Sequence, residues 1–534
     1  MNSHQASSSP DITLPTKTDM VVVSLKCPSY IDSSDVDHPK TKTLTSQVQK
    51  ITLGPIIGSV TDSTARILVE FERSGTETIS LVSPEGTKSQ CTKQVPARRP
   101  TVFSFTGLSA KTIYNVLSDH SFPVESSSFR TLTGKSSPLQ LAFCSNNNRR
   151  VSAEYNEETC LWNDLATRAV QKQIDYIIHL GGQVDIDSSN VYKEARRLLD
   201  QYEEKDWRKA VGKIRELLRE EYRKTFGSKA QATAMANCPN LMQFSDLEMK
   251  AGVGARPSRL PPDTIEGFYL QQARYVYYEY QRQLREDIDF KNLNKFQHEF
   301  HKHVVNGVGV FFVDHLGKDS WLNAPEKGQF GKYQWGVLKG ALSTGAGGFD
   351  GCDAVIIASS QPIVIHDKGF MKLTNKKSVK FAGEDTNPRY IKEQAALLSL
   401  LEDWKDASNT TQREVYLVCG GFDKVGYTDI NHCGHKALTQ IVTAGICQKL
   451  PKLNPLSPTY QPDRETVLQQ SWSFVHRDWS AKNSYVLLSM KKGKASVTTV
   501  EMITSAPSEK IEAKSVVLTN SRPCKSEKAC CTIF

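Results

Sequence analysis

The residues best suited to chemistry stand at the end of an apolar run within 173–187, QIDYIIHLGGQVDID. The first half of this stretch has the length and apolar character of a buried strand, with His179 near its end. The strand breaks at Gly181-Gly182 and is followed by Asp185 and Asp187. Open α/β sheets place their active sites at the carboxyl ends of their strands. The stretch therefore predicts a site whose main chemical groups are carboxylates.

Other strand-like runs end in residues of the same kind. These are 139–143, followed by Cys144, Ser145 and Asn146; 241–248, with Asp246 and Glu248; 304–314, ending at Asp314; 414–421, followed by Asp423; and 363–365, followed by His366. Any one acid at such a position is most simply a cap or loop residue. Their repeated placement at strand ends supports a shared site.

Helical patterns between these runs predict the elements that position them. The stretch 192–226 places apolar residues on one face of an amphipathic helix, and further helices are predicted at 163–171, 265–286, 333–342 and 390–404. Further strands are predicted at 354–360, 438–443, 485–490 and 495–502. Strands that alternate with helices indicate an α/β domain with βαβ units. We expect a layered α/β domain with a sheet on each side of the site.

Residues 50–133 show a different pattern. Short alternating runs at 65–72, 78–82, 102–105 and 113–117 are separated by turn residues, which favours a β-sandwich. The segment 108–114, LSAKTIY, resembles the tyrosine corner of fibronectin type III-like domains. Residues 1–49 are rich in Ser, Thr, Asp and Lys and predict a disordered leader.

Composition excludes several classes of protein. The chain has 534 residues, 39% hydrophobic and 23% charged, with a net charge of +9 and no recognisable nucleic-acid-binding module. We find neither a signal peptide nor the roughly 18–20 apolar residues of a membrane helix, so we expect synthesis in the cytosol.

The 12 cysteines have irregular spacing and are expected to be free thiols. The motif at 432–435, HCGH, lacks two further zinc ligands and is interpreted as a loop.

The order of these strand ends resembles the PhoD-like branch of the metallophosphatases, alkaline phosphatase D and its eukaryotic relatives, from about 51 to 502. Five family motifs carry the resemblance: an S-C-x-N turn, H-L-G-D-Q-I-Y-x-D, L-M-x-W-D-D-H-D/E, D-x-R with a following Q-x-x-W helix, and G-D-V-H. In this chain they correspond to 143–146, 179–187, 241–248, 314–316 with Gln334-Trp335, and 420–423. The resemblance implies a metallophosphatase-like fold of two sheets flanked by helices, preceded by a fibronectin type III-like β-sandwich.

The resemblance also implies a binuclear metal centre for the hydrolysis of phosphoric esters, bridged by an Asp. Several family ligands are replaced in this chain. The bridging Asp corresponds to Gly182, the Tyr ligand to Asp185, the His of D-D-H to Leu247, the acid and His of G-D-V-H to Gly421 and Asp423, and the Arg of D-x-R to Leu316. Loss of the bridging acid, both imidazoles and the guanidinium removes the centre of the family's site.

Two hypotheses about function remain open. In the first, the chain is a pseudophosphatase with a binding or scaffolding role, for a phosphate-containing or protein ligand, with no catalytic residue and no metal. In the second, it is an active metal-dependent phosphodiesterase or phosphomonoesterase that holds one Mg, Ca, Mn or Fe ion in a rewired site. The ligands would be Cys144, Asp185, Asp187, Asp246 and Asp423, and the cleft would be lined by Asn146, Glu248, Asp314, His366 and His476.

The last residues predict a lipid anchor. Cys531 is followed by Thr532, Ile533 and a terminal Phe, which fits the C-a-a-X prenylation signal. One lipid anchors reversibly, so Cys530 is a candidate for a second lipid. We therefore expect localisation at the cytoplasmic face of a membrane. The predicted domains are a leader at 1–49, the sandwich at 50–133, a PhoD-like domain at 137–505 and a flexible tail at 506–534.

Overall fold

The structure is a computed structural model. It describes residues 49–133, 137–148, 150, 159–186, 189–250, 263–293, 298–315, 330–343, 348–364, 391–407, 413–422, 424–449, 465–468, 472–491, 497–506 and 509–518. The predicted leader at 1–49 lies outside this part of the chain except for its last residue. No helix in the described ranges has both the length and the apolar character to cross a membrane.

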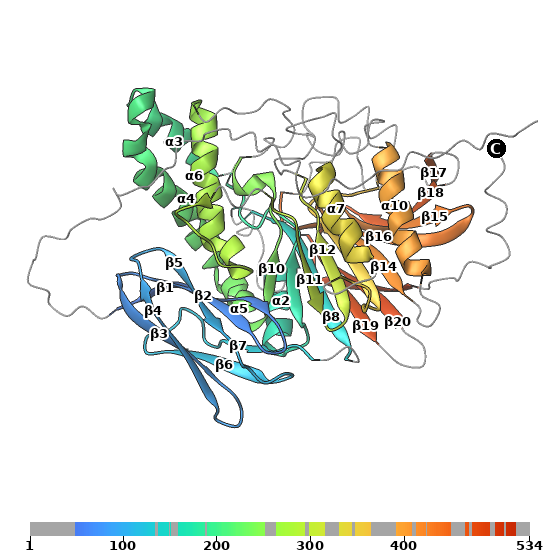
Figure 1. The fold of residues 1–534 in the computed structure, drawn as a ribbon, viewed down its shortest axis with the longest axis horizontal. Helices are drawn as coiled ribbons and strands as arrows, with labels where there is room; N and C mark the ends of the chain where they lie inside the picture. Colours follow the sequence, from blue (N-terminus) through green and yellow to red (C-terminus); the bar gives the residue numbers. More distant parts are fainter. Residues whose placement is uncertain are drawn as a thin grey trace, which may run out of the picture.

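The N-terminal part is a sandwich of two antiparallel sheets, as its alternating pattern predicts (Figure 1). One sheet has the order β1-β2-β5 and the other β4-β3-β6-β7. The strands are β1 (Ile51–Val60), β2 (Ala65–Phe71), β3 (Gly75–Val82), β4 (Lys88–Val95), β5 (Pro100–Phe105), β6 (Ile113–Ser118) and β7 (Ser128–Arg130). The tyrosine corner is confirmed, because the backbone N–H of Ser109 donates to the Tyr114 hydroxyl over 2.9 Å.

The remaining strands form one branched, mixed sheet of 14 strands. They are β8 (Leu139–Asn147), β9 (Tyr176–His179), β10 (Asn240–Met242), β11 (His301–Val305), β12 (Val308–Phe312), β13 (Ala354–Ser359), β14 (Glu414–Phe422), β15 (Val425–His432), β16 (His435–Cys447), β17 (Glu465–Leu468), β18 (Trp472–Ser480), β19 (Asn483–Lys491), β20 (Val497–Ser505) and β21 (Glu512–Leu518). One half contains β11–β18, and the other contains β8–β10 and β19–β21. The halves join where β16 pairs with β8 at Gly445 and Cys447.

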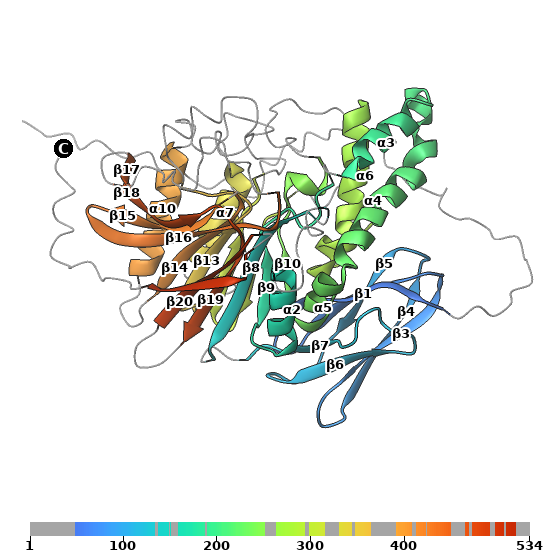
Figure 2. The same ribbon diagram turned by 180° about the vertical axis from the view of Figure 1, so that it is seen from behind.

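Helices cover the outer faces of the two halves, so the layers run helix, sheet, sheet, helix. The helices are α2 (Leu161–Val170), α3 (Val191–Leu199), α4 (Val211–Phe226), α5 (Lys229–Asn237), α6 (Ile265–Tyr280), α7 (Gly331–Leu342) and α10 (Ile391–Asp406). Helices α7 and α10 lie over one half and α2 and α5 over the other (Figures 1 and 2). Along β13, Ile356 enters the central core while Ile357 packs under the helices, as the period of two in a strand requires.

Three predicted elements differ from the structure. The single helix expected at 192–226 is divided into α3, a 3₁₀ helix at Glu204–Ala210 and α4. The single strand expected at 304–314 is instead the hairpin β11–β12, because Asn306-Gly307, with φ of 47° and 78°, forms its turn. The predicted flexible tail at 506–534 begins too early, because β21 pairs along its length with β20.

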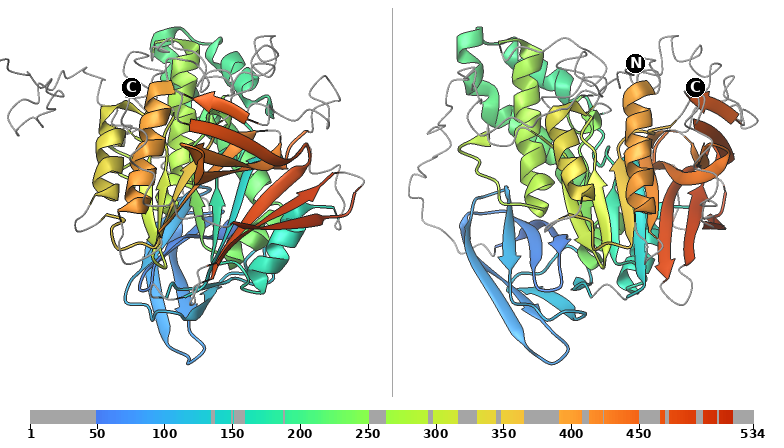
Figure 3. Two further views of the ribbon diagram at one scale, coloured as in Figure 1. Left: turned by 90° about the vertical axis from the view of Figure 1, so that its right-hand side faces the viewer. Right: turned by 45° about the vertical axis from the view of Figure 1, so that its right-hand side comes forward.

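The sandwich lies against the α/β part (Figure 3) and is joined to it by buried polar contacts. Glu70 of β2 is fully buried and accepts from Arg223 Nε over 2.6 Å and from the Tyr280 hydroxyl. The Lys172 ammonium donates to the carbonyls of Ser128 and Asn237, each over 2.8 Å. Breaking a buried ion pair costs about 3–5 kcal/mol, so these contacts fix the sandwich beside the strands that hold the site.

Candidate functional site

The carboxyl ends of β8, β9 and β10 lie side by side, because these three strands are parallel neighbours (Figures 1 and 2). The loop that follows β9 packs against the end of β8. The N–H groups of Asn146 and Asn147 donate to the carbonyls of Gly181 and Gly182 over 3.0 and 2.7 Å. The described part of the stretch 173–187 therefore lies where its strand pattern predicts. We call this region the site edge.

Gly182 has no room for a side chain. Its φ is +70°, and a Cβ atom would lie 2.5 Å from Oδ1 of Asn146 and 3.0 Å from Cδ1 of Leu247. Gly421, near the end of β14, is equally confined: its φ is +68°, and a Cβ would lie 2.0 Å from the carbonyl oxygen of Ser360. The resemblance places two metal-binding acids of the family at these two positions. Here the space beside each backbone is filled by the protein.

Glu248 is the acid at the centre of the site edge. Its Oε1 accepts from the N–H of Gln183 over 2.6 Å, and its Oε2 accepts from the N–H and hydroxyl of Ser245, each over 2.9 Å. The Ser245 hydroxyl accepts in turn from Leu247 N–H, which completes a capping box around the 3₁₀ helix Asp246–Glu248. Burial raises the pKa of Glu248 to about 7, although these hydrogen bonds act to lower it.

Cys144 and His179 contact each other under this loop. Cys144 Sγ lies 3.5 Å from Nδ1 of His179, whose Nε2 lies 2.9 Å from the amide oxygen of Asn240. Burial lowers the pKa of His179 to about 4 and raises that of Cys144 well above its ordinary value. The imidazole is therefore neutral, with Nε2–H donating to Asn240, and Cys144 is a protonated thiol. In the described structure this pair is a buried thiol–imidazole contact.

Asparagine side chains at the end of β8 contact other amides. Asn146, in a left-handed conformation with φ of 40°, donates to Gln448 over 3.2 Å. Asn147 donates to Gln231 over 2.8 Å. Asn148 donates over 2.9 Å to Oδ2 of Asp185, which is half-buried. Neutral amides thus occupy much of the space around the site edge.

The other predicted residues are distributed more widely. Asp314 follows β12, and its Oδ2 accepts from Glu299 N–H over 2.9 Å. His476 lies on β18, where its Nδ1 is 2.8 Å from the Thr428 hydroxyl of β15. Asp246 is buried in the 3₁₀ helix beside Glu248. Asp187, His366, Asp423, Cys530 and Cys531 lie outside the described residues.

The described residues do not fit the binuclear centre that the resemblance implies. Where the structure describes the chain, no three His, Cys, Asp or Glu side chains are grouped so that they could hold a metal ion. The position of the bridging acid is closed by Asn146 and Leu247, and Glu248 accepts from protein donors. No step of a metal-dependent reaction follows from this arrangement.

Two groups of functional interest were not predicted from the sequence. The first is the capping box. Its sequence signal is Ser245 followed three residues later by Glu248, but the pattern of this segment predicts the end of a strand. The second is a cluster of arginines around Glu299, which no motif announces. Its only signal is the spacing of Arg274, Arg282 and Arg285, which places them on one helical face.

Comparisons with known proteins bear on the fold. No family model and no curated protein matches the sequence. Among solved structures, the chain is similar to one titled "Structure of PhoD", with a TM-score of 0.58 and 10% identity, over 90% of this chain and 94% of that one. A β-glucuronidase from Ruminococcus gnavus matches with a TM-score of 0.24 and 8% identity, over 70% of this chain and 54% of that one, and carries no argument. The chain therefore has a PhoD-like fold, as the resemblance predicts.

The raised pKa of Glu248 predicts a pH-dependent stability. The ordinary pKa of a glutamate, 4.5, applies to the unfolded chain, and the folded value is about 7. Between these values the folded protein retains a proton that the unfolded chain releases, so the stability that Glu248 contributes falls as the pH rises. Between pH 4.5 and 7 we expect the free energy of unfolding of the wild type to fall by about 3 kcal/mol. We expect no such fall for a Glu248→Gln variant. Urea unfolding at several pH values measures both profiles, and parallel profiles would contradict this prediction.

Proposed function

We propose that this chain is a phosphatase-fold protein that has lost hydrolytic activity and acts as a binding or scaffolding protein. The observation that carries the proposal is the closed space at Gly182. A binuclear centre needs a carboxylate between its two cations to offset their charge. At Gly182 and at Gly421 the backbone conformation disfavours any side chain, and neighbouring atoms occupy the first position of one.

The hydrogen bonds of the site edge support the same proposal. Glu248, the best-placed acid, accepts from backbone and hydroxyl groups of the loops it joins. Leu247, at the position of a family His, contributes an apolar methyl group beside Gly182. These groups stabilise the edge without a cation. They leave the protein with the surface of a phosphatase fold and without its reaction centre.

The alternative function is that of a metal-dependent phosphodiesterase with one cation. The observation in its favour is Asp185, which is half-buried and close to Asn148, so that carboxylate and amide oxygens meet. Oxygen donors of this kind suit Mg²⁺ or Ca²⁺. This function would also need Asp187 and Asp423, which are predicted ligands outside the described residues.

Turnover of a generic phosphodiester separates the two functions. We expect no hydrolysis of bis(p-nitrophenyl) phosphate by the full chain with Mg²⁺, Mn²⁺, Ca²⁺ or Fe²⁺. We also expect none from Gly182→Asp, because the added side chain meets Asn146. Gly107→Asp is the matched control for the effect of the substitution on stability. Gly107 has φ of +69° and open space beside it, so Gly107→Asp introduces the same backbone strain without a clash with neighbouring atoms. Turnover by the wild type that disappears in Asp185→Ala would establish the alternative.

We further propose that the protein is held at the cytoplasmic face of a membrane by prenylation of Cys531, with Cys530 as a candidate for a second lipid. The support is the C-a-a-X pattern. Cys531→Ser should move the protein from the membrane pellet to the soluble fraction of a cell lysate, and Cys433→Ser, which changes an exposed cysteine of a hairpin turn, should not. An unchanged distribution of Cys531→Ser would refute the anchor.

A further inference from the structure

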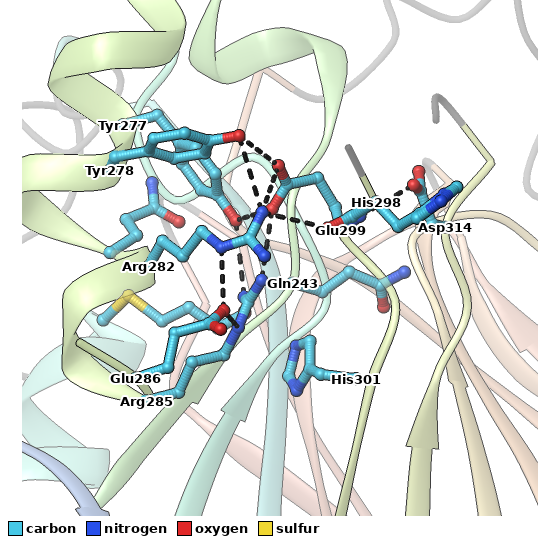
Figure 4. Close-up of polar contacts among 12 residues, drawn as sticks. Gln243, Tyr277, Tyr278, Arg282, Arg285, Glu286, His298, Glu299, His301 and Asp314 are labelled. Atoms are coloured by element: carbon cyan, nitrogen blue, oxygen red, sulfur yellow. Dashed lines mark hydrogen bonds and ion pairs between the residues drawn. The ribbon is translucent and has the colours of Figure 1, made fainter. Parts of the chain in front are cut away.

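Three arginines surround the carboxylate of Glu299, and Figure 4 shows two of them, Arg282 and Arg285. Oε1 accepts from Nη2 of Arg274 over 3.2 Å and from Nη1 of Arg282 over 2.8 Å, and Oε2 accepts from Nη2 of Arg285 over 3.1 Å. Arg274 lies on α6, Arg282 begins the 3₁₀ helix Arg282–Leu284 and Arg285 directly follows it. Glu299 comes from the segment that leads into β11. One carboxylate therefore meets three guanidinium groups.

Two hydroxyl groups complete the surroundings of Glu299. Tyr278 donates to Oε1 and Tyr277 to Oε2, each over 3.1 Å. We call the five donor residues the Glu299 cage: Arg274, Tyr277, Tyr278, Arg282 and Arg285. A carboxylate offers about four lone-pair positions, two on each oxygen. Here five residues donate to the carboxylate, three of them to Oε1. The cage therefore has more donors than this carboxylate has favourable acceptor positions.

The positive charge of the cage also exceeds the negative charge of Glu299. Three positive guanidinium groups face one negative charge in Glu299, and Glu286 contacts two of them from outside, at Nε of Arg282 and Arg285 over 2.7 and 3.3 Å. Burial would raise the pKa of Glu299, but the three arginines outweigh it and lower the pKa, so the carboxylate stays ionised.

The cage lies beside the site edge, and one of its arginines is more exposed than the others. Arg285 reaches the carbonyl of Met242 at the end of β10 over 3.4 Å, and Glu299 N–H donates to Asp314 after β12. The side chains of Arg282, Arg285 and Glu299 are 5–7% exposed, whereas that of Arg274 is 41% exposed. Arg274 is therefore the member of the cage nearest to solvent.

We propose that the Glu299 cage is an oxyanion site that the chain fills with its own carboxylate, and that phosphate or a phosphate monoester competes with Glu299 for it. Guanidinium groups bind phosphate oxygens in the same fork geometry that they use for carboxylates. A tetrahedral phosphate has four oxygens, so it accommodates all five donors without crowding three onto one atom. The ligand class is thus a phosphate group presented without a metal ion.

This proposal does not depend on the loss of hydrolytic activity. The cage uses side chains of α6 and of the segments around it, and Gly182, Gly421 and Glu248 take no part in it. A failure of phosphate to bind would leave the account of the site edge unchanged. If both proposals hold, phosphate-containing ligands are bound next to an edge that does not hydrolyse them.

Inorganic phosphate and a Glu299→Ala variant of the full chain test the proposal. Removing the carboxylate takes away the anion that the three arginines share, so the variant should unfold at a lower temperature. Phosphate should raise its unfolding temperature in a saturable manner and bind at least about tenfold more tightly than to the wild type, as titration calorimetry measures. Sodium chloride at equal ionic strength is the control for screening.

Glu279→Ala is the matched control variant. Glu279 is equally buried and binds a single arginine, Arg219, through two contacts of 2.8 and 2.9 Å. If phosphate stabilises Glu279→Ala as much as Glu299→Ala, any broken ion pair attracts phosphate and the cage proposal is wrong. Adding Arg274→Ala to Glu299→Ala should weaken phosphate binding at least about tenfold, because a charged contact to the phosphate is lost.

Glu299→Gln provides a second test if Glu299→Ala does not fold. It keeps the shape of the side chain but removes its charge, and it should bind phosphate more tightly than the wild type. Recovery of folded Glu299→Ala on refolding with phosphate, but not with chloride, would also support the cage. The absence of saturable phosphate binding to Glu299→Gln, together with no recovery of Glu299→Ala, would overturn the proposal.

Discussion

The site edge depends on the buried carboxyl of Glu248. It accepts from Gln183 N–H in the loop after β9 and from Ser245 in the loop after β10, and so holds the two loops together. A buried donor left without an acceptor costs about 1–3 kcal/mol, so these contacts are difficult to exchange for a cation. Because Gly181 and Gly182 have no side chains, the loops approach closely enough for the contacts to form.

Buried carboxylates elsewhere in the protein are also bound by its own groups. Glu70 is bound by Arg223, Glu279 by Arg219, and Glu299 by its cage. Each is buried, and a buried charge is tolerated only when hydrogen bonds and an opposite charge compensate for its loss of water. Fixed guanidinium groups thus supply, in this PhoD-like fold, positive charge next to the ends of β10 and β12.

The sequence predicts most of the architecture, because strand and helix periodicity reports which face is buried. The sandwich, its tyrosine corner and the existence of β8 and β12 follow from local patterns, although β8 continues past Cys144 to Asn147. Prediction fails where one residue changes the local conformation, as at the turn Asn306-Gly307. It also fails for β21, whose first four residues are exposed and carry little hydrophobic signal. The partners of Glu248 and Glu299 come from distant segments, so no local pattern contains them.

The central claim is that the site edge is closed by the protein and holds no catalytic metal. The measurement that tests it most directly is the metal content of the full chain, purified without chelator and analysed by inductively coupled plasma mass spectrometry. We expect well below one transition metal, Mg or Ca ion per chain, unchanged in Asp185→Ala. One or two tightly bound ions per chain, lost in Asp185→Ala, would contradict the account.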